Sequence, residues 1–308
     1  QRQQMATKVL ERGEHVDFVK DGSTIVLVAS ALLFVRWVLL KTTFRPFAKR
    51  MMGLVNKELD KHSRLGVEKY CKYAWHFLIY AILFCWGVKL LFESEWSVLR
   101  SGSVNNVWID FPHSGSEKLA LKAFYMAQIS WYTHSVVESL MVDKCRSDFI
   151  MLVVHHFLAV ALLVGSFWGN AHRVGITVCV EQDIADIIMY FSKMVQKSVA
   201  VPWLQAKELH TFLLFLLFAA WTSFRIIFLG WILIKAPMTI TRLSLFPGPA
   251  NFDLLTGTLY VQLVMLLGMQ IIWGVGLGKM CFDLLRTGDF FDFWHDNRPE
   301  AASAKKET

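Results

Sequence analysis

The chain has 308 residues, of which 55% are hydrophobic, with a formal net charge of +7 and a mean hydropathy of +0.40. A soluble globular domain of this length would carry more charge and fewer unbroken apolar runs, so the composition excludes that class. The positive charge does not indicate a nucleic-acid partner, because many of the basic residues gather in one segment between two apolar stretches.

About seven stretches are long and apolar enough to cross a bilayer as helices, which takes about 20 residues each. The first lacks a small-residue cleavage site and is followed by basic residues, so we expect a retained anchor rather than a cleaved signal peptide. The fifth is the least apolar, and a strict hydropathy threshold would miss it. The predicted fold class is therefore an all-α polytopic membrane protein. The predicted limits of the spans are 23–40, 74–92, 119–141, 149–168, 174–196, 211–234 and 254–278.

Basic residues between the first two stretches predict the orientation of the chain. By the positive-inside rule they place this connection in the cytosol, the N-terminus in the lumen and, after seven spans, the C-terminus in the cytosol. The polar connections 93–118 and 235–253 are then lumenal loops. The basic residues are Lys41, Arg45, Lys49, Arg50, Lys57, Lys61, Arg64, Lys69 and Lys72.

Three segments follow from this pattern. Residues 1–73 hold the N-terminal segment, the first span and the basic connection, residues 74–286 form the main membrane domain, and residues 287–308 form a polar cytosolic tail. Lys305 and Lys306 in that tail fit a dilysine retrieval signal, which predicts residence in the endoplasmic reticulum membrane. The five cysteines form no disulfide framework or metal motif.

Ionisable side chains inside the fourth and fifth stretches are the strongest functional signal. Such groups are costly in lipid and normally face a cavity or a partner. The fourth stretch carries His155 and His156 side by side, and the fifth carries Asp183 and Asp186. A short connection makes the two helices antiparallel, and at about 1.5 Å per residue His155 and Asp186 both lie roughly 18–20 Å from the lumenal face. We therefore expect the histidines to meet the aspartates, with Lys193 on the cytosolic side of them.

Two other interpretations compete with a catalytic role. A lone histidine in an apolar helix is more often a packing residue, but two histidines matched in depth by two aspartates favour function. A metal site would also use these residue types. Adjacent helical positions point about 100° apart, however, and are poorly spaced to bind one ion, so we expect no metal.

The run RSDFIMLVVHHFLAVALLVGSFWGNAHRVGITVCVEQDIADIIMYFSKM resembles the signature region of the ceramide synthase family within the TLC-domain superfamily. The RSDF entry, the His-His pair, the AHRVG turn and the D-x-x-D pair followed by Lys-Met occur in the family's order. The detailed resemblance covers about residues 119–235. It implies a TLC-type helical bundle or barrel that encloses a lipid cavity.

The chain departs from the family pattern at three places. Gln182 stands where the family usually has a histidine, and of the common Thr-Arg-Leu only Arg225 is kept. The 41–73 segment is too short for the homeobox-like module of many animal members, so the chain resembles the shorter type.

The resemblance implies N-acylation of a sphingoid base by a fatty acyl-CoA, giving ceramide and coenzyme A. The acyl-CoA is a co-substrate, and no cofactor is expected. A histidine can act as the general base for the amine, or attack the thioester and form an acyl-imidazole. We expect His155 to be the acyl acceptor or principal base, His156 its partner, and Asp183 and Asp186 to orient and charge-stabilise the imidazoles.

Other residues are candidates for substrate contacts. Basic residues near the cytosolic face are candidates for the acyl-CoA head group, and polar or aromatic residues of the third span for the cavity wall. The former are Lys144, Arg146, Lys193, Lys197 and Lys207; the latter are Trp131, Tyr132, His134 and Glu138, with Arg225 in the sixth span.

Two alternatives stay open. One is a TLC-type lipid carrier or regulator without acyltransferase activity, and a weaker one is a membrane transporter. The sequence leaves the acyl-chain preference and any oligomer or accessory subunit undecided.

Overall fold

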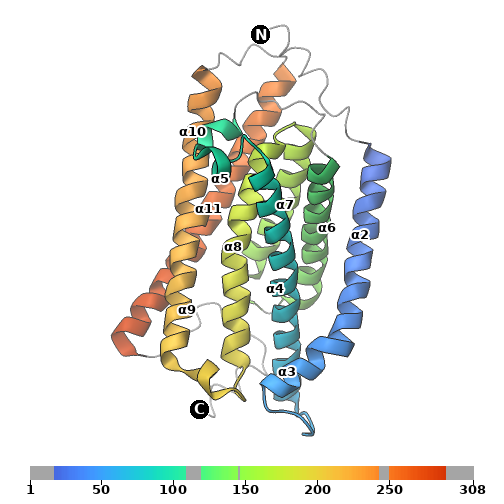
Figure 1. Ribbon diagram of the computed structural model, residues 1–308, viewed down its shortest axis with the longest axis vertical. Coiled ribbons are helices and arrows are strands. Elements are labelled where there is room, and N and C mark those ends of the chain that lie inside the picture. The colour runs from blue at the N-terminus through green and yellow to red at the C-terminus, as the bar shows by residue number, and fades with distance from the viewer. Residues whose placement is uncertain (1–16, 109–118, 145, 243–249, 289–308) are drawn as a thin grey trace.

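The computed structural model describes residues 17–108, 119–144, 146–242 and 250–288, and these residues are largely helical (Figure 1). The predicted tail with Lys305 and Lys306 lies outside the described residues, as do 109–118 and 243–249 of the two predicted lumenal loops. The elements are α2 (Phe18–Leu39), η1 (Leu40–Phe44), α3 (Arg45–Met51), α4 (Lys61–Glu93), α5 (Val98–Ser101), η2 (Val104–Val107), α6 (Leu119–Val142), α7 (Phe149–Trp168), α8 (His172–Lys197), η3 (Pro202–Gln205), α9 (Lys207–Ala220), η4 (Trp221–Phe228), α10 (Leu229–Arg242) and α11 (Ala250–Thr287).

Each of the seven predicted stretches is helical, which confirms the helix predictions. Among the described residues, five helical runs are both long and apolar enough to cross a membrane, so the chain is a multi-pass membrane protein. Polar and charged side chains keep α6 and α8 out of this set, as expected for α8 from its composition. The five runs are Val19–Met51, Lys61–Glu93, Phe149–Trp168, Lys207–Lys235 and Leu255–Thr287.

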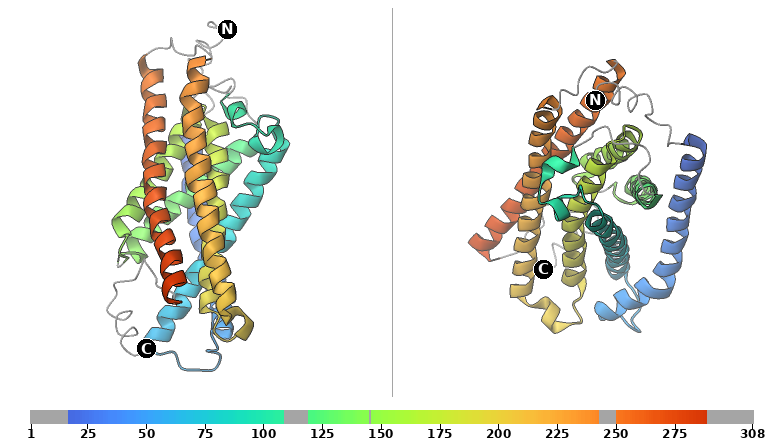
Figure 2. Two further views of the ribbon diagram at one scale, coloured as in Figure 1. Left: turned by 90° about the vertical axis from the view of Figure 1, so that its left-hand side faces the viewer. Right: turned by 45° about the horizontal axis from the view of Figure 1, so that its top comes forward.

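Six of the long helical runs form a ring. Going around it, α4 contacts α8, α8 contacts the α9–η4 run, that run contacts α11, α11 contacts α7, α7 contacts α6, and α6 contacts α4. Helix α2 lies outside the ring against α6 (Figures 1 and 2). The short elements α5 and η2 pack at one end of the ring, where η2 contacts α10.

Most of the basic connection 41–73 is predicted to be helix lying near the membrane surface, and the structure confirms that it is mostly helical. Helices continue into it from both sides, as far as Met51 and back to Lys61, and leave only residues 52–60 as a turn. The reason is that apolar residues within the basic segment pack between the two helix ends. Ala48 of α3 is buried against Val67, Tyr70 and Cys71 of α4. The predicted loops 93–118 and 235–253 are likewise shortened, because α5, η2, α10 and α11 occupy much of them.

Helices α7 and α8 form the tight antiparallel pair that the short connection predicts. Only residues 169–171 separate them, and Asn170 adopts a left-handed backbone conformation with φ of 56°. Asparagine tolerates this conformation better than most residues with a side chain. The hairpin brings the two helices that carry the histidines and the aspartates next to each other.

Candidate active site

A polar cavity of about 810 Å³ occupies the ring. At one end its walls include the exposed residues Arg45 of α3 and Glu68 of α4, so the cavity is open to solvent there. At the other end its walls include His155, His156 and Arg225. The cavity therefore joins the end with the basic segment 41–73 to the predicted reaction centre.

Basic side chains outnumber acidic ones two to one around this cavity. Eight lysines and arginines line it against four carboxylates. Of the predicted head-group contacts, Arg146, Lys193 and Lys197 are on the wall, whereas Lys144 and Lys207 are not among the lining residues. The ammonium of Lys193 lies 5.6 Å from the ring centroid of Tyr73 and 5.5 Å from that of Tyr190. An anionic ligand would fit this electrostatic surrounding.

A second, smaller cavity of about 90 Å³ lies between α7, α8 and α11. Its walls are almost entirely apolar, and His155 is the residue that both cavities share among those that line them. Tyr132 and Gln182 add polar groups near the same end. The other lining residues are Trp108, Ala159, Leu162, Leu163, Ser166, Ala171, Val174, Gly175, Val178, Cys179, Thr256, Leu259, Tyr260, Leu263 and Leu266.

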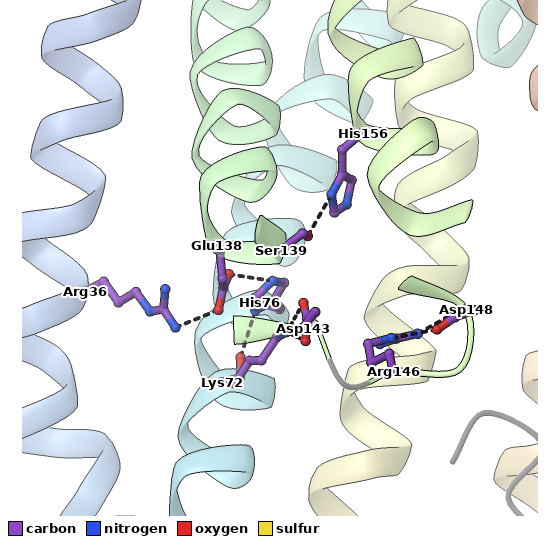
Figure 3. Close-up of polar contacts among 9 residues, drawn as sticks. All are labelled: Arg36, Lys72, His76, Glu138, Ser139, Asp143, Arg146, Asp148 and His156. Carbon is purple, nitrogen blue, oxygen red and sulfur yellow. Dashed lines mark hydrogen bonds and ion pairs between the residues drawn. The ribbon is translucent and has the colours of Figure 1, made fainter. Parts of the chain in front are cut away.

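The two histidines have different surroundings. Their ring centroids are 5.6 Å apart. The Nδ1 atom of His156 lies 3.0 Å from the hydroxyl oxygen of Ser139 on α6 (Figure 3). The Nδ1 atom of His155 has no hydrogen-bond partner, and its ring packs against the indole of Trp273. His156 is thus fixed by a polar contact and His155 by packing.

The two aspartates do not bond to the histidines as the depth matching predicted. Asp183 is fully buried and accepts a hydrogen bond from Nε2 of Gln128 at 3.3 Å. Asp186 lines the polar cavity with both histidines but is paired with the guanidinium of Arg225. No hydrogen bond or ion pair joins either aspartate to His155 or His156 in the part of the chain that the structure describes. The aspartates were expected at the same depth as the histidines, but the rotation of α8 directs Asp183 toward α6 and Asp186 toward η4.

Arg225 lies on η4, a π-helical stretch inside the long α9–α10 run. Such stretches frequently occur at functional sites, because the extra residue redirects side chains. The guanidinium donates to the backbone carbonyl of Gln182 from Nε at 3.1 Å and from Nη2 at 2.6 Å, and to Asp186. It also lies 4.2 Å from the ring centroid of Trp221. Arg225 therefore joins η4 to α8 at the cavity wall.

The predicted contacts on α6 divide into two groups. Tyr132 lines the apolar cavity, and its ring is edge-on to His156 with centroids 6.4 Å apart. Trp131 and His134 line neither cavity; they stack on each other at 5.2 Å and pack toward α4.

Glu138 is buried between α2 and α4. It accepts a hydrogen bond from Nη2 of Arg36 at 2.6 Å, and its other oxygen lies 3.2 Å from Nε2 of His76 (Figure 3). The expected polar face of α6 thus binds neighbouring helices rather than facing either cavity.

Ion pairs surround the open end of the polar cavity. Lys72 donates to Asp143 at 2.6 and 2.7 Å, and Arg146 donates to both oxygens of Asp148 at 2.8 Å (Figure 3). Burial raises the pKa of Asp148, but the hydrogen bonds and charge of Arg146 outweigh it, so the pKa ends below its ordinary value. In the described residues, no three His, Cys, Asp or Glu side chains are arranged to hold a metal ion.

The profile of the TLC domain family matches residues 69–277. The chain belongs to the TLC domain family. It is 28% identical to ceramide synthase 5 of Mus musculus over 172 residues, which are 51% of this chain and 40% of that protein. It is 26% identical to ceramide synthase hyl-1 of Caenorhabditis elegans over 206 residues, 65% and 53% of the two chains. It is 24% identical to ceramide synthase LOH2 of Arabidopsis thaliana over 266 residues, which are 85% of this chain and 86% of that protein. The chain spans about half the length of the first curated relatives it matches.

The TLC domain match includes Gln182, where the chain departs from the ceramide synthase pattern. Its side-chain oxygen accepts from Nε2 of Gln270 at 2.9 Å, and its amide donates to Glu181 at 2.9 Å. The group of Gln182 that accepts from Arg225 is its backbone carbonyl, which any residue would supply. A glutamine in place of a histidine therefore leaves this contact unchanged.

The residues that the sequence analysis did not single out include Ser139, Asp148 and Trp273. Asp148 belongs to the quoted RSDF run and could have been singled out there. Ser139 and Trp273 carry no local signal, since a serine and a tryptophan in apolar helices are ordinary packing residues. Arg36 of α2, which also lines the polar cavity, lies outside the matched TLC domain.

Proposed function

We propose that this TLC domain protein is a ceramide synthase, which transfers a fatty acyl group from acyl-CoA to the amine of a sphingoid base. The observation that carries the proposal is that His155 lines both a basic, polar cavity and an apolar one. A fatty acyl thioester has the same division, with an anionic nucleotide on one side of the reacting carbonyl and an alkyl chain on the other. Its carbonyl carbon would lie beside His155.

The basic cavity accepts the coenzyme A portion. Arg146, Lys193 and Lys197 are positioned to contact its phosphates near the open end. The alkyl chain enters the apolar cavity past Tyr132. Trp131 and His134 line neither cavity, so we assign the substrate contact on α6 to Tyr132 rather than to them.

His155 acts as the acyl acceptor in the first step. Its unprotonated ring nitrogen attacks the thioester carbonyl, a carbon–nitrogen bond forms, the carbon–sulfur bond breaks, and coenzyme A leaves as a thiolate that takes up a proton. In the second step the amine attacks the acyl-imidazole, the amide forms and His155 is released. The amine's proton passes through His156 to solvent, which balances the proton on the thiol.

Asp186, Arg225 and Asp183 are the polar groups of α8 and η4 near the histidines. Asp186 lines the cavity and is available to the cationic or hydrogen-bonding head of the sphingoid base, while Arg225 holds its other side. Asp183, bonded to Gln128, acts as a buried support for α8. An apolar surrounding protects the acyl-imidazole from water.

We place the protein in the endoplasmic reticulum membrane with seven spans, a lumenal N-terminus and a cytosolic C-terminus. The basic segment 41–73 and the open end of the polar cavity lie on one side, which supports a cytosolic entrance for acyl-CoA. Residues 74–286 would be the catalytic membrane domain, flanked by residues 1–73 and 287–308. The reaction needs no cofactor, since acyl-CoA is itself a substrate.

Purified protein with acyl-CoA and sphinganine tests this function. We expect ceramide from the wild type and none from His155→Ala, with an acyl mass added to the wild type by acyl-CoA alone. An adduct that persists in the His155→Ala/His156→Ala double variant would exclude both histidines as acceptor. No ceramide from the wild type under conditions that support a known synthase, with His155→Ala giving the same result, would overturn the proposal in favour of a carrier or regulator.

A further inference from the structure

The orientation of the His155 imidazole is not fixed by a hydrogen bond at Nδ1. That nitrogen is buried and without a partner, whereas the neighbouring His156 is bonded to Ser139. A nucleophilic ring that turned away from the thioester would lose most of its effect, because rates fall steeply with small errors of approach. Another group must therefore hold this ring at the boundary between the two cavities.

Trp273 of α11 provides the closest aromatic contact of this ring in the described residues. The two ring centroids are 5.3 Å apart and the planes meet at 86°, an edge-to-face arrangement. Aromatic pairs favour this geometry because of their quadrupoles. On its other side Trp273 packs edge-on against Trp221, with centroids 6.2 Å apart at 82°. The indole is thus confined between His155 and the π-helical stretch.

The indole is also held by a carboxylate. Its Nε1–H donates to Oδ2 of Asp148 at 3.3 Å, and both residues are less than a tenth exposed. Asp148 in turn accepts two hydrogen bonds from Arg146 at 2.8 Å. A bidentate pair between arginine and a carboxylate fixes the direction of the carboxylate. Asp148 therefore joins the open end of the polar cavity, where Arg146 lies, to the ring that packs on His155.

We propose that Trp273 and Asp148 are positioning residues for His155: Asp148 holds the indole, and the indole holds the imidazole toward the thioester. This inference rests on the proposed function. Arg146 has two tasks in this arrangement, since it contacts the head group and anchors Asp148. Ordinary core packing would not require the indole N–H to point at a buried carboxylate, which makes the contact specific for tryptophan.

Kinetic variants test this arrangement. Trp273→Phe keeps an aromatic ring but loses the N–H, and Asp148→Ala removes the acceptor. We expect each to lower kcat for ceramide formation by about 3- to 10-fold, with KM for acyl-CoA within about 2-fold for Trp273→Phe. The double variant should be no slower than the worse single one, because both changes remove the same contact. Trp203→Phe, on an exposed residue of η3, is the matched control and should leave both constants unchanged.

Structural damage and positioning are separated by two further measurements. Asp148→Asn keeps an oxygen that can accept from the indole, so it should recover most of the kcat lost in Asp148→Ala. The KM for acyl-CoA should rise, because Arg146 loses its charged partner and is held less firmly at the head group. Thermal unfolding of each variant shows whether it is folded. Losses that multiply in the double variant, or an Asp148→Asn enzyme as slow as Asp148→Ala, would overturn the positioning role.

A readout independent of turnover distinguishes this inference from the proposed function. Diethyl pyrocarbonate modifies accessible imidazoles, and peptide mass analysis measures its rate at His155 alone. Trp273→Phe and Asp148→Ala should change that rate by at least about 3-fold and to the same extent. A wild type that makes no ceramide but shows this response would refute the function and keep the positioning. Ceramide formation by the wild type, with a modification rate that is unchanged in both variants, would keep the proposed function and refute the positioning role.

Discussion

Nη2 of Arg36 on α2 donates a hydrogen bond of 2.6 Å to Oε1 of Glu138 on α6, and the carboxylate is almost fully buried. Helix α2 precedes the matched TLC domain and packs outside the ring of six helical runs. Lys122 of α6 and Asp21 of α2 form another ion pair between the same helices at 2.7 Å, but the pair of Arg36 with Glu138 is the more buried of the two. Arg36 also lines the polar cavity.

Removing the arginine should destabilise the protein. Arg36→Met removes the guanidinium from the buried Glu138 carboxylate, whose other oxygen contacts His76, and breaking a buried pair from one side costs about 3–5 kcal/mol. We expect a fall of several degrees in the thermal unfolding temperature in detergent. Arg50→Met, at an exposed position of α3, is the matched control and should change it little. An Arg36→Met protein as stable as that control would show that α2 needs no such pair.

The hydroxyl of Ser139 should be needed for full activity. Ser139→Ala removes the group that bonds to Nδ1 of His156, so the ring loses its fixed orientation for proton transfer. A hydrogen bond of this kind contributes about 0.5–1.5 kcal/mol, so kcat should fall by about 2- to 10-fold. Steady-state kinetics with acyl-CoA and sphinganine measures this effect.

Ser135 offers a matched control one turn away on α6. It is also buried, but its hydroxyl donates to the backbone carbonyl of Trp131 and contacts neither histidine. Ser135→Ala should keep kcat. Ser139→Thr, which retains a hydroxyl, should recover part of the activity. Equal losses in the two alanine variants would indicate that buried serines of α6 matter only for packing.

The helix positions could be predicted from sequence because bilayer-spanning stretches have a simple length and hydropathy signature. The limits 149–168 of α7 agree with the structure, and those of α8 and α6 differ by a few residues. The prediction that most of the basic segment 41–73 is helical is confirmed. The packing of Ala48 against Tyr70, which holds the two helix ends together there, could not be read from the sequence.

The site could be located but not assembled from sequence. Depth along a helix follows from residue number, so His155 and Asp186 were correctly placed at one level and on one cavity. Rotation about the helix axis depends on all the neighbours at once, and it directed Asp186 to Arg225 instead. The contacts of Trp273 with Asp148 and His155 join residues more than 100 positions apart, which no local pattern reveals.

Asp148 should make stability depend on pH in acid. Its pKa in the folded protein is below the ordinary value, because the bonds and charge of Arg146 outweigh the opposing effect of burial. A group with a lowered folded pKa stabilises fully above its unfolded pKa of about 3.9 and loses that effect as the pH falls through the folded pKa. The difference in unfolding temperature between wild type and Asp148→Asn should therefore be constant from about pH 7 to 5 and shrink below about pH 4. Thermal scans across this range measure it; a gap that stays constant down to pH 3 would contradict the pairing.

The apolar cavity has a length that the helices define. On α7 its wall runs from His155 to Ser166 and on α11 from Leu266 to Thr256, which at about 1.5 Å per residue is roughly 15–17 Å. Trp108, next to η2 in the connection between α4 and α6, adds a large aromatic side chain to this wall. Trp108 also belongs to one buried cluster with Leu229, Ile232 and Leu233 of α10, so its side chain takes part both in the cavity wall and in the packing against that helix.

Replacing Trp108 with a smaller apolar residue should shift the substrate preference toward longer acyl chains. Trp108→Leu keeps the position apolar but shortens the side chain, and each methylene admitted or excluded in an apolar pocket changes specificity by about tenfold or more. We expect the ratio of kcat/KM for a longer acyl-CoA to that for the wild type's best substrate to rise by at least about tenfold. Rates measured over a series of saturated acyl-CoAs test this shift. Trp96→Leu is the matched control, since Trp96 belongs to the same connection, packs beneath Arg173 and lines neither cavity. If both variants keep the wild-type chain-length profile, the wall at Trp108 does not select the acyl chain; if both shift alike, the connection acts through its fold rather than through this indole.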